Sequence, residues 1–304
     1  MPLTKLALPA LALCCVLAVG EESQTPKETV TVKAGTEELV FRRVSPSKYG
    51  GEAADFYMLE TEVTNRMFEK YLKANKLTKG DAAIFKKHKE RKDELERKIK
   101  DGEPFTFTSS TIDAADHIIK AEWLWPDDKM PEKRGQYPVS FVTVLEAAAF
   151  CEWLTKLHPE LGTFRLPKLE EWKIAAYGKD RSYPWGNDWD EARVRKSKDE
   201  QNEVKDFPNG RTPEGLYGIF GNVSEFIIHP SHVRNVTFIN VGGRWAGGAF
   251  NEDEFKEKQT YWGYWHNSEG RSQEIGFRVL LDVTDKEHKF EHQVPYDMEQ
   301  RQQE

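Results

Sequence analysis

Apolar residues with strand or helix spacing begin near residue 39. The run Leu39 to Val44 has the aliphatic and aromatic content of a strand. In 61–75, Thr64 can cap a helix, and the apolar residues that follow share one helical face: Met67, Phe68, Tyr71 and Leu72. We therefore predict a strand followed by an amphipathic helix whose role is packing.

Two further helices have clear start signals. Thr143 and Glu146 form a capping box in front of the apolar stretch 144–157. Pro167 suits the first turn of the next helix, because its missing N–H needs no partner there. Cys151 lies in the apolar pattern of 144–157, which predicts a core residue rather than a reactive thiol. The second helix has one apolar face, formed by Leu169, Trp172, Ala175 and Ala176.

The segment Gly215 to Phe226 has neither the apolar spacing of a helix nor that of a strand. It reads GLYGIFGNVSEF, and its three glycines predict turns and close backbone approaches in place of a helix or strand. Asn222 and Glu225 offer oxygen atoms beside backbone carbonyls, and calcium prefers such ligands. The alternative is that both side chains only cap this turn through hydrogen bonds.

Polar stretches separate these segments. Between 79 and 136 the chain is dense in charges of both signs, which predicts a solvated insertion, either a plain surface elaboration or a partner-binding surface. Trp125 within it is expected to fold back onto the core. Residues 21–38 read as a polar linker, and 284–304 as a loosely held polar tail.

The amino terminus has the layout of a cleaved secretory signal over residues 1–20. Lys5 precedes an apolar run too short to span a bilayer, and small residues end it. A lipid anchor on Cys14 or Cys15 is the alternative, disfavoured because a small residue is preferred before the modified cysteine. We therefore predict an exported protein, located in the periplasm, in the cell envelope or outside the cell.

Composition limits the classes of partner. With 304 residues, of which 38% are hydrophobic and 12% aromatic, the chain can bury a substantial core. The formal net charge is -7, and basic residues are interleaved with acidic ones. A nucleic-acid-binding surface needs clustered positive charge. No nucleic-acid partner and no transmembrane segment are therefore expected.

Six separate stretches of sequence lie before and after the glycine-rich segment. In their order and spacing, these six blocks and the glycine-rich segment resemble the sulfatase-modifying factor family, whose founding member is the formylglycine-generating enzyme. The resemblance covers residues 39–283, with 79–136 inserted. It implies a single α+β domain of the formylglycine-generating-enzyme type, related to C-type lectins, with much irregular structure. The blocks lie at 56–72, 137–154, 164–178, 183–188, 241–250 and 275–281.

The resemblance implies a chemistry whose residues this chain lacks. The family enzyme uses two cysteines near its carboxyl end that bind copper(I), a soft ion that prefers thiolates. The matching stretches, 247–252 and 261–267, contain no cysteine, and none follows Cys151. Copper-dependent formylglycine generation is therefore not expected.

Another branch of the family, the sulfoxide synthases, holds iron with three histidines. His229, His232 and His266 leave open a metal-dependent oxidoreductase of this or a related kind. Pro230 favours a loop here, and scattered surface histidines are the more common case. Whether the chain is an enzyme stays open at this point.

The family also implies calcium at the glycine-rich segment. The ligands would be the backbone carbonyls of Gly221 and Val223 and the carboxylate of Glu225. Gly218 matches a fourth ligand position but has no side-chain oxygen, so the site is weakened. At the family's other calcium site, Arg193 stands in place of an asparagine. Calcium is therefore the cofactor that this segment suggests, beside the metal that the histidine alternative would require.

A binding role without catalysis fits these features best. Clustered aromatics near the carboxyl end can stack on a sugar or a peptide. The alternative is that most of these aromatics belong to the core. A structural role in a cell-envelope assembly is a third reading. The candidate groove consists of Arg244, Trp245, Phe250, Tyr261, Trp262, Trp265 and His266.

Overall fold

The structure is a computed structural model of the chain. It describes residues 27–80, 97, 100–101, 125, 129–194, 201–228, 239–242, 252–253 and 271–286. Two sheets and short helices make up these residues, joined by long irregular segments. The α-helices with described bounds are α1 (Asn65–Asn75), α4 (Val144–Leu157) and α5 (Leu169–Tyr177). The 3-10 helices are η1 (Pro46–Tyr49), η4 (Glu132–Arg134), η5 (Glu191–Arg193) and η6 (Pro208–Gly210).

The larger sheet has five strands in the order β1-β2-β3-β8-β4. Gly35 lies in the two-residue turn between β1 and β2, where its φ of 65° suits the tight hairpin. Strand β8 pairs with β3 on one side and β4 on the other, so the two ends of the domain meet in one sheet. The strands are β1 (Thr29–Ala34), β2 (Glu37–Val44), β3 (Phe56–Leu59), β4 (Thr163–Arg165) and β8 (Leu280–Asp282).

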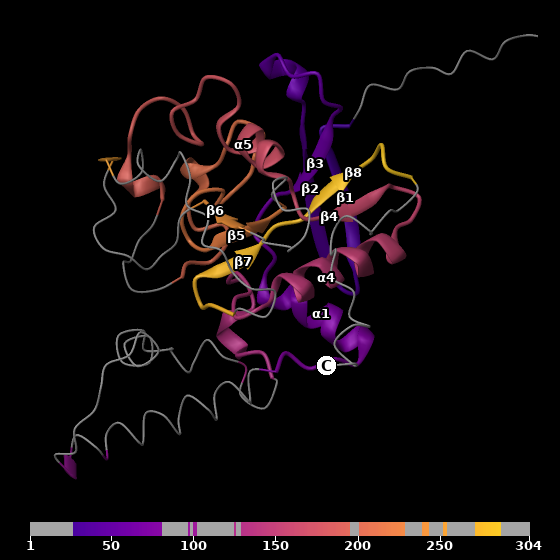
Figure 1. Cartoon of the computed structure of the whole chain (residues 1–304), viewed down its shortest axis with the longest axis vertical. Coiled ribbons are helices and arrows are strands. Elements are labelled where there is room, and N and C mark those ends of the chain that lie inside the picture. Colours follow the sequence, from indigo (N-terminus) through magenta and orange to yellow (C-terminus); the bar gives the residue numbers. More distant parts are fainter. Residues whose placement is uncertain are drawn as a thin grey trace, which may run out of the picture.

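The smaller sheet has the order β6-β5-β7 and lies beside the larger one in Figure 1. Its strands are β5 (Ser224–Ile227), β6 (Ile239–Val241) and β7 (Ile275–Phe277). Strand β5 runs antiparallel to β6 and parallel to β7. Two residues separate β7 from β8, so this short connection links the two sheets directly.

Both faces of the larger sheet are covered. Tyr57 and Leu59 of β3 pack in the core that contains residues of α1 and α4. Phe56 and Met58 of the same strand pack in a second core, with residues of α5. Successive strand residues point to opposite faces, which explains why all four are buried. In Figure 1, α1 and α4 lie together below the sheet, and α5 lies to its left, near β3.

The predicted helices are present, but Pro167 lies before Lys168, the N-cap of α5, and therefore not in the first turn as predicted. Thr64 caps α1 by accepting a hydrogen bond from the backbone N–H of Met67 at 3.2 Å. The capping box of α4 is complete, with the Thr143 side chain accepting from Glu146 N at 3.1 Å and Glu146 accepting from Thr143 N at 2.8 Å. The core positions predicted for Cys151 and Trp125 are also confirmed, since both are buried.

Two sequence interpretations need correction. Thr29–Ala34 is a strand, so the predicted linker over 21–38 is wrong for its second half; alternating residues of β1 are buried against the core. Ser224–Ile227 is also a strand, although 215–226 was expected to be irregular throughout. Its four residues are all buried, and a strand covered on both faces has no polar alternation to reveal it. Most of the 79–136 insertion lies outside the described residues.

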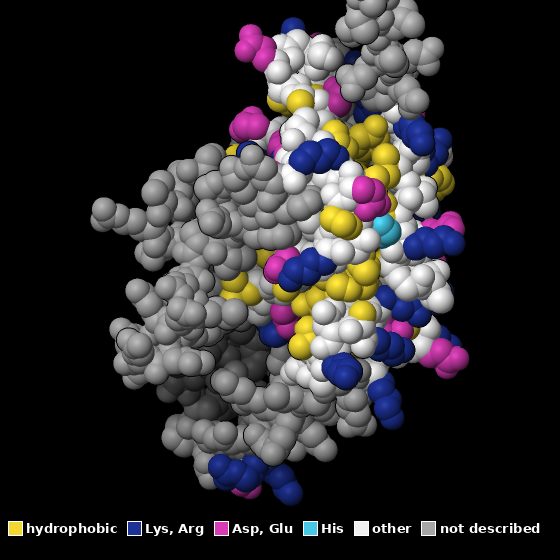
Figure 2. All heavy atoms as spheres, turned by 90° about the vertical axis from the view of Figure 1, so that its right-hand side faces the viewer, with side chains coloured by type: hydrophobic (Ala, Val, Ile, Leu, Met, Phe, Trp, Pro, Cys, Tyr) yellow, Lys and Arg dark blue, Asp and Glu magenta, His cyan; other side chains and the backbone are white. Residues whose placement is uncertain are grey.

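The part of the surface that the structure describes is mixed in charge. On the face shown in Figure 2, Lys and Arg side chains alternate with Asp and Glu side chains, and small hydrophobic areas lie between them. Among the described residues, no helix is both long enough and apolar enough to cross a membrane.

Candidate functional site

The seven residues of the predicted aromatic groove, Arg244, Trp245, Phe250, Tyr261, Trp262, Trp265 and His266, all lie outside the described residues. The structure does describe both ends of the segment that carries the first three. At one end, the backbone N–H of Gly221 donates to the carbonyl of Gly242 at 2.5 Å. At the other, the Tyr183 hydroxyl donates to Glu252 at 2.5 Å. Gly242 and Glu252, the described residues on either side of 243–251, are therefore both bound to the described part of the domain.

Tyr183 belongs to an aromatic cluster built from the turn-rich block 183–188. Its ring stacks on Trp185 with centroids 5.5 Å apart and an interplanar angle of 11°. Trp189 lies 5.4 Å from Tyr183, tilted against it. Burial, together with the nearby Glu252 carboxylate, raises the pKa of Tyr183 to about 12, so the hydroxyl stays protonated and donates. Trp185 and Trp189 are half-buried and remain accessible in part.

A second site lies in the interior, where three ionisable side chains meet. Glu62, Glu225 and Arg278 form this buried charge cluster, and all three are fully buried. Nε of Arg278 donates to Oε1 of Glu225 at 2.9 Å. The indole N–H of Trp172 donates to the other oxygen of Glu225 at 2.8 Å. The carboxylate of Glu225 thus receives a donor on each oxygen.

Arg278 links the two sheets through its remaining N–H groups. It donates to the carbonyl of Leu59 at 2.9 Å and to that of Tyr217 at 2.6 Å. Leu59 ends β3, and Tyr217 belongs to the glycine-rich segment. A buried guanidinium is stable only when its donors are paired. The cluster therefore connects the end of β3, the glycine-rich segment and β5.

Glu62 occupies the space beside Gly218. A Cβ atom at position 218 would lie 2.7 Å from both carboxylate oxygens of Glu62, so only glycine fits there, and its φ of 57° also favours glycine. Nδ2 of Asn222 donates to one oxygen of Glu62 at 2.9 Å. The other oxygen makes no hydrogen bond among the described residues and lies 3.9 Å from Arg278.

The protonation of Glu62 follows from this setting. Burial raises its pKa to about 8, opposed by the positive charge of Arg278 and assisted by the negative charge of Glu225. At neutral pH the carboxyl group is therefore mostly protonated. The cluster then contains one anion, Glu225, and one cation, Arg278.

The calcium ligands predicted from the sequence lie in this same region. Glu225 faces the fixed cation of Arg278, and Glu62 is held toward its neutral form. A calcium ion needs several oxygen ligands that together carry negative charge. As placed, the side chains fit an internal ion pair better than a calcium ion. Calcium bound by Gly221, Val223 and Glu225 stays a prediction.

The alternative metal site predicted from the sequence consists of three histidines. His229, His232 and His266 all lie outside the described residues. Within the residues that are described, no group of three or more His, Cys, Asp or Glu side chains is arranged to hold a metal ion. The histidine site therefore also stays a prediction.

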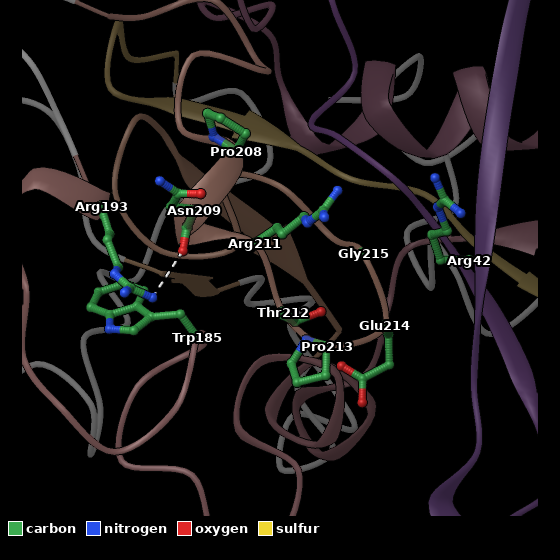
Figure 3. A pocket seen from close by; sticks show the side chains of 10 residues that line it. All are labelled: Arg42, Trp185, Arg193, Pro208, Asn209, Arg211, Thr212, Pro213, Glu214 and Gly215. Carbon is green, nitrogen blue, oxygen red and sulfur yellow. Dashed lines mark hydrogen bonds between the residues drawn. The ribbon is translucent and has the colours of Figure 1, made fainter.

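An open pocket of about 510 Å³ lies between β2 and the loop that follows η6 (Figure 3). Three arginines from separate segments line it, and we call it the arginine pocket: Arg42 of β2, Arg193 of η5 and Arg211 after η6. Figure 3 shows Arg42 on one side, Arg193 and Trp185 on the opposite side, and Arg211 between them. The other lining residues are Pro208, Asn209, Thr212, Pro213, Glu214 and Gly215.

Sequence reasoning assigned no chemistry to Arg278 or to the pocket. Arg278 had a usable signal, because an arginine between apolar residues of a strand pattern must find a buried partner. The three arginines of the pocket had no such signal in the sequence. They are separated by up to 169 positions, Arg42 to Arg211, and only the fold brings them together.

The architecture described above is the α+β arrangement with much irregular chain that the resemblance implied. This is the formylglycine-generating-enzyme type of fold. Residues 17–283 match the sulfatase-modifying factor enzyme 1-like domain, so the chain belongs to that family.

Solved structures agree on the fold. Variable protein 1 of Treponema denticola is 18% identical, covering 84% of this chain and 99% of its own, with a TM-score of 0.53. PvdO of Pseudomonas aeruginosa is 15% identical, covering 85% of this chain and 100% of its own, with a TM-score of 0.55. At these identities the likeness concerns the fold alone. Comparison with curated protein sequences returned no match.

Proposed function

We propose that this protein is an exported, non-catalytic member of its family that binds a peptide, a glycan or a cell-envelope partner. The observation that carries the proposal is the set of cysteines. The chain has three, of which Cys14 and Cys15 lie in the predicted secretory signal. Only Cys151 remains for the domain.

Cys151 is unsuited to the family's copper chemistry. Its side chain is fully buried in α4, and burial raises the pKa of the thiol. Copper(I) requires accessible thiolates, and one buried thiol cannot replace an exposed pair. A domain that keeps the family fold but lacks the family's reactive cysteines can still bind a ligand or a partner.

The proposed binding surface is the aromatic groove. Its first part, with Arg244, Trp245 and Phe250, is carried by a segment whose flanks are bound to Gly221 and Tyr183. The half-buried Trp185 and Trp189 beside Tyr183 extend the aromatic character of this region. Aromatic side chains with one accessible face suit stacking on sugars and on peptide side chains.

Glycan and peptide arrays probed with the labelled mature protein test this proposal. We expect the double variant Trp262→Ala, Trp265→Ala to bind the parent's ligands about tenfold more weakly, or worse, because buried aromatic anchors dominate such interfaces. Leu157→Ala is the matched control, since Leu157 is an apolar side chain with 45% of its surface exposed at the end of α4.

Circular dichroism of each variant establishes that it is folded before binding is compared. A folded double variant that keeps every ligand of the parent overturns the proposed groove. Elemental analysis of the protein purified without chelators addresses the competing assignment. Stoichiometric iron or copper would replace the binding role by an oxidoreductase that uses His229, His232 and His266.

A further inference from the structure

The arginine pocket carries more positive charge than its acidic neighbours neutralise. Arg193 donates to Asp190 at 2.9 Å, which satisfies that pair. Arg42 is paired with Glu60, but Lys205 is paired with the same carboxylate. One anion therefore serves two cations on that side of the pocket.

Arg211 adds a further cation. It is exposed, and among the described residues no carboxylate pairs with it. Its only hydrogen bond to a described residue is a long one, 3.4 Å, to the hydroxyl of Tyr217. Its guanidinium fork is accordingly available to an incoming oxyanion, in the geometry that suits carboxylate and phosphate groups.

Glu214 is the one carboxylate among the described residues that line the pocket, and another cation, Arg181, already pairs with it. Arg181 donates to both of its oxygens at 3.2 Å, and the Tyr49 hydroxyl donates to one of them. Burial lowers the pKa of Arg181 to about 10, so it stays charged at neutral pH. Glu214 therefore does not cancel the excess of the pocket arginines.

The pocket wall is held in place before any ligand arrives. The backbone of Gly215 has a φ of 94°, and a Cβ atom there would lie 3.3 Å from Nε of Arg42. Thr212 fixes the turn, because its carbonyl accepts from Gly215 N at 2.9 Å and its own N–H donates to Leu216 O at 3.0 Å. Glu60 and Thr29 orient the Arg42 guanidinium. Such preorganisation reduces the entropy lost on binding.

We propose that the arginine pocket binds a small organic anion through a carboxylate or phosphate group. The oxyanion contacts Arg211 and Arg42, and the rest of the ligand lies against Trp185 and the two prolines that line the pocket. A volume of about 510 Å³ suits a metabolite-sized ligand rather than a polymer. Trp185 extends the proposed aromatic groove and also lines this pocket, but none of the seven groove residues is among its described lining residues, so substitutions in those seven test the proposed function separately.

Isothermal titration of the mature protein with citrate and, separately, with inorganic phosphate tests the proposal. Chloride at matched ionic strength is the reference, since a general charge effect would appear there as well. The two probes distinguish a carboxylate ligand from a phosphate ligand. Arg211→Gln removes a guanidinium that has no carboxylate partner among the described residues and leaves the ion pairs of Arg42 and Arg193 in place.

We expect Arg211→Gln to bind the preferred anion about tenfold more weakly or worse, as the loss of a charge-assisted hydrogen bond implies. Lys156→Gln is the matched control, because it removes one positive charge from an exposed side chain on α4 and should leave the affinity unchanged. Arg211→Glu should abolish binding.

Three outcomes overturn the inference: no binding of either anion by the parent, an equal loss in Lys156→Gln, or full affinity in a folded Arg211→Glu variant. Circular dichroism confirms the fold of each variant. If only the double tryptophan variant loses its array ligands while anion binding persists, the two sites are separate, as we infer.

Discussion

The buried charge cluster and the arginine pocket both contain arginines, but Arg278 and Arg211 differ in burial and in the number of their hydrogen-bond partners. Arg278 is fully buried, and Glu225, Leu59 and Tyr217 accept its hydrogen bonds. Arg211 is exposed and has no described carboxylate partner. A buried charge must be saturated by fixed partners for the fold to be stable, whereas an exposed one is solvated by water. Only the second kind of arginine is available to a ligand.

The largest expected effect comes from removing the cation of the buried charge cluster. Arg278→Met leaves Glu225 buried without its ion pair and frees the two carbonyls that Arg278 joins. We expect the free energy of unfolding to fall by about 3–5 kcal/mol. Urea unfolding followed by circular dichroism measures it.

Arg211→Met is the matched control for that experiment, since it makes the same substitution in the arginine pocket. The double variant Arg278→Met, Glu225→Gln should recover part of the lost stability, because the buried anion is then also removed. A loss in Arg278→Met no larger than that in Arg211→Met would contradict the contrast drawn between the two regions.

The second effect concerns pH and arises from Glu62. In the unfolded chain this carboxyl group titrates near its ordinary value of 4.5, whereas burial raises its pKa in the folded protein to about 8. Between these values the unfolded state releases the proton and the folded state keeps it. The contribution of Glu62 to stability is therefore fully retained below pH 4.5 and is lost as the pH rises toward 8, by at most about 1.4 kcal/mol per pH unit.

Glu62→Gln removes this titration while keeping the shape of the side chain. Urea unfolding at a series of pH values between about 5 and 8 should show a flatter profile for the variant than for the parent. Glu152→Gln, which changes a partly exposed carboxylate on α4, should leave the profile unchanged. Parallel profiles for Glu62→Gln and the parent would show that Glu62 is ionised in the folded protein.

The smallest effect is expected in the arginine pocket. Arg211→Gln should change the free energy of unfolding by no more than about 0.5 kcal/mol, because no described ion pair or short hydrogen bond is lost. The same urea measurement checks it. A loss of several times that size would mean that Arg211 supports the fold, and the pocket would then resemble the buried cluster rather than differ from it.

Local elements were predictable because the interactions that define them span few residues. The capping box of Thr143 and Glu146 is complete within three positions, and the apolar face of α1 repeats within four. Strand β5 was missed because its partners β6 and β7 lie further along the chain and it is buried on both faces, so that no alternation of polar and apolar residues marks it. Strand β1 pairs with β2 across a two-residue turn, so its alternating residues were a local signal that the interpretation as a linker overlooked.

The amino-acid sequence alone was enough to identify the family, the three α-helices among the described residues and the lack of a cysteine pair in the carboxyl-terminal blocks. The roles of the charged residues follow from the folded arrangement instead. Arg278 reaches Glu225 across 53 positions, and Asn222 reaches Glu62 across 160. Burial and the field of distant charges set the protonation of Glu62 and leave Arg211 available. These quantities depend on which side chains the folded chain brings together, and no local pattern encodes them.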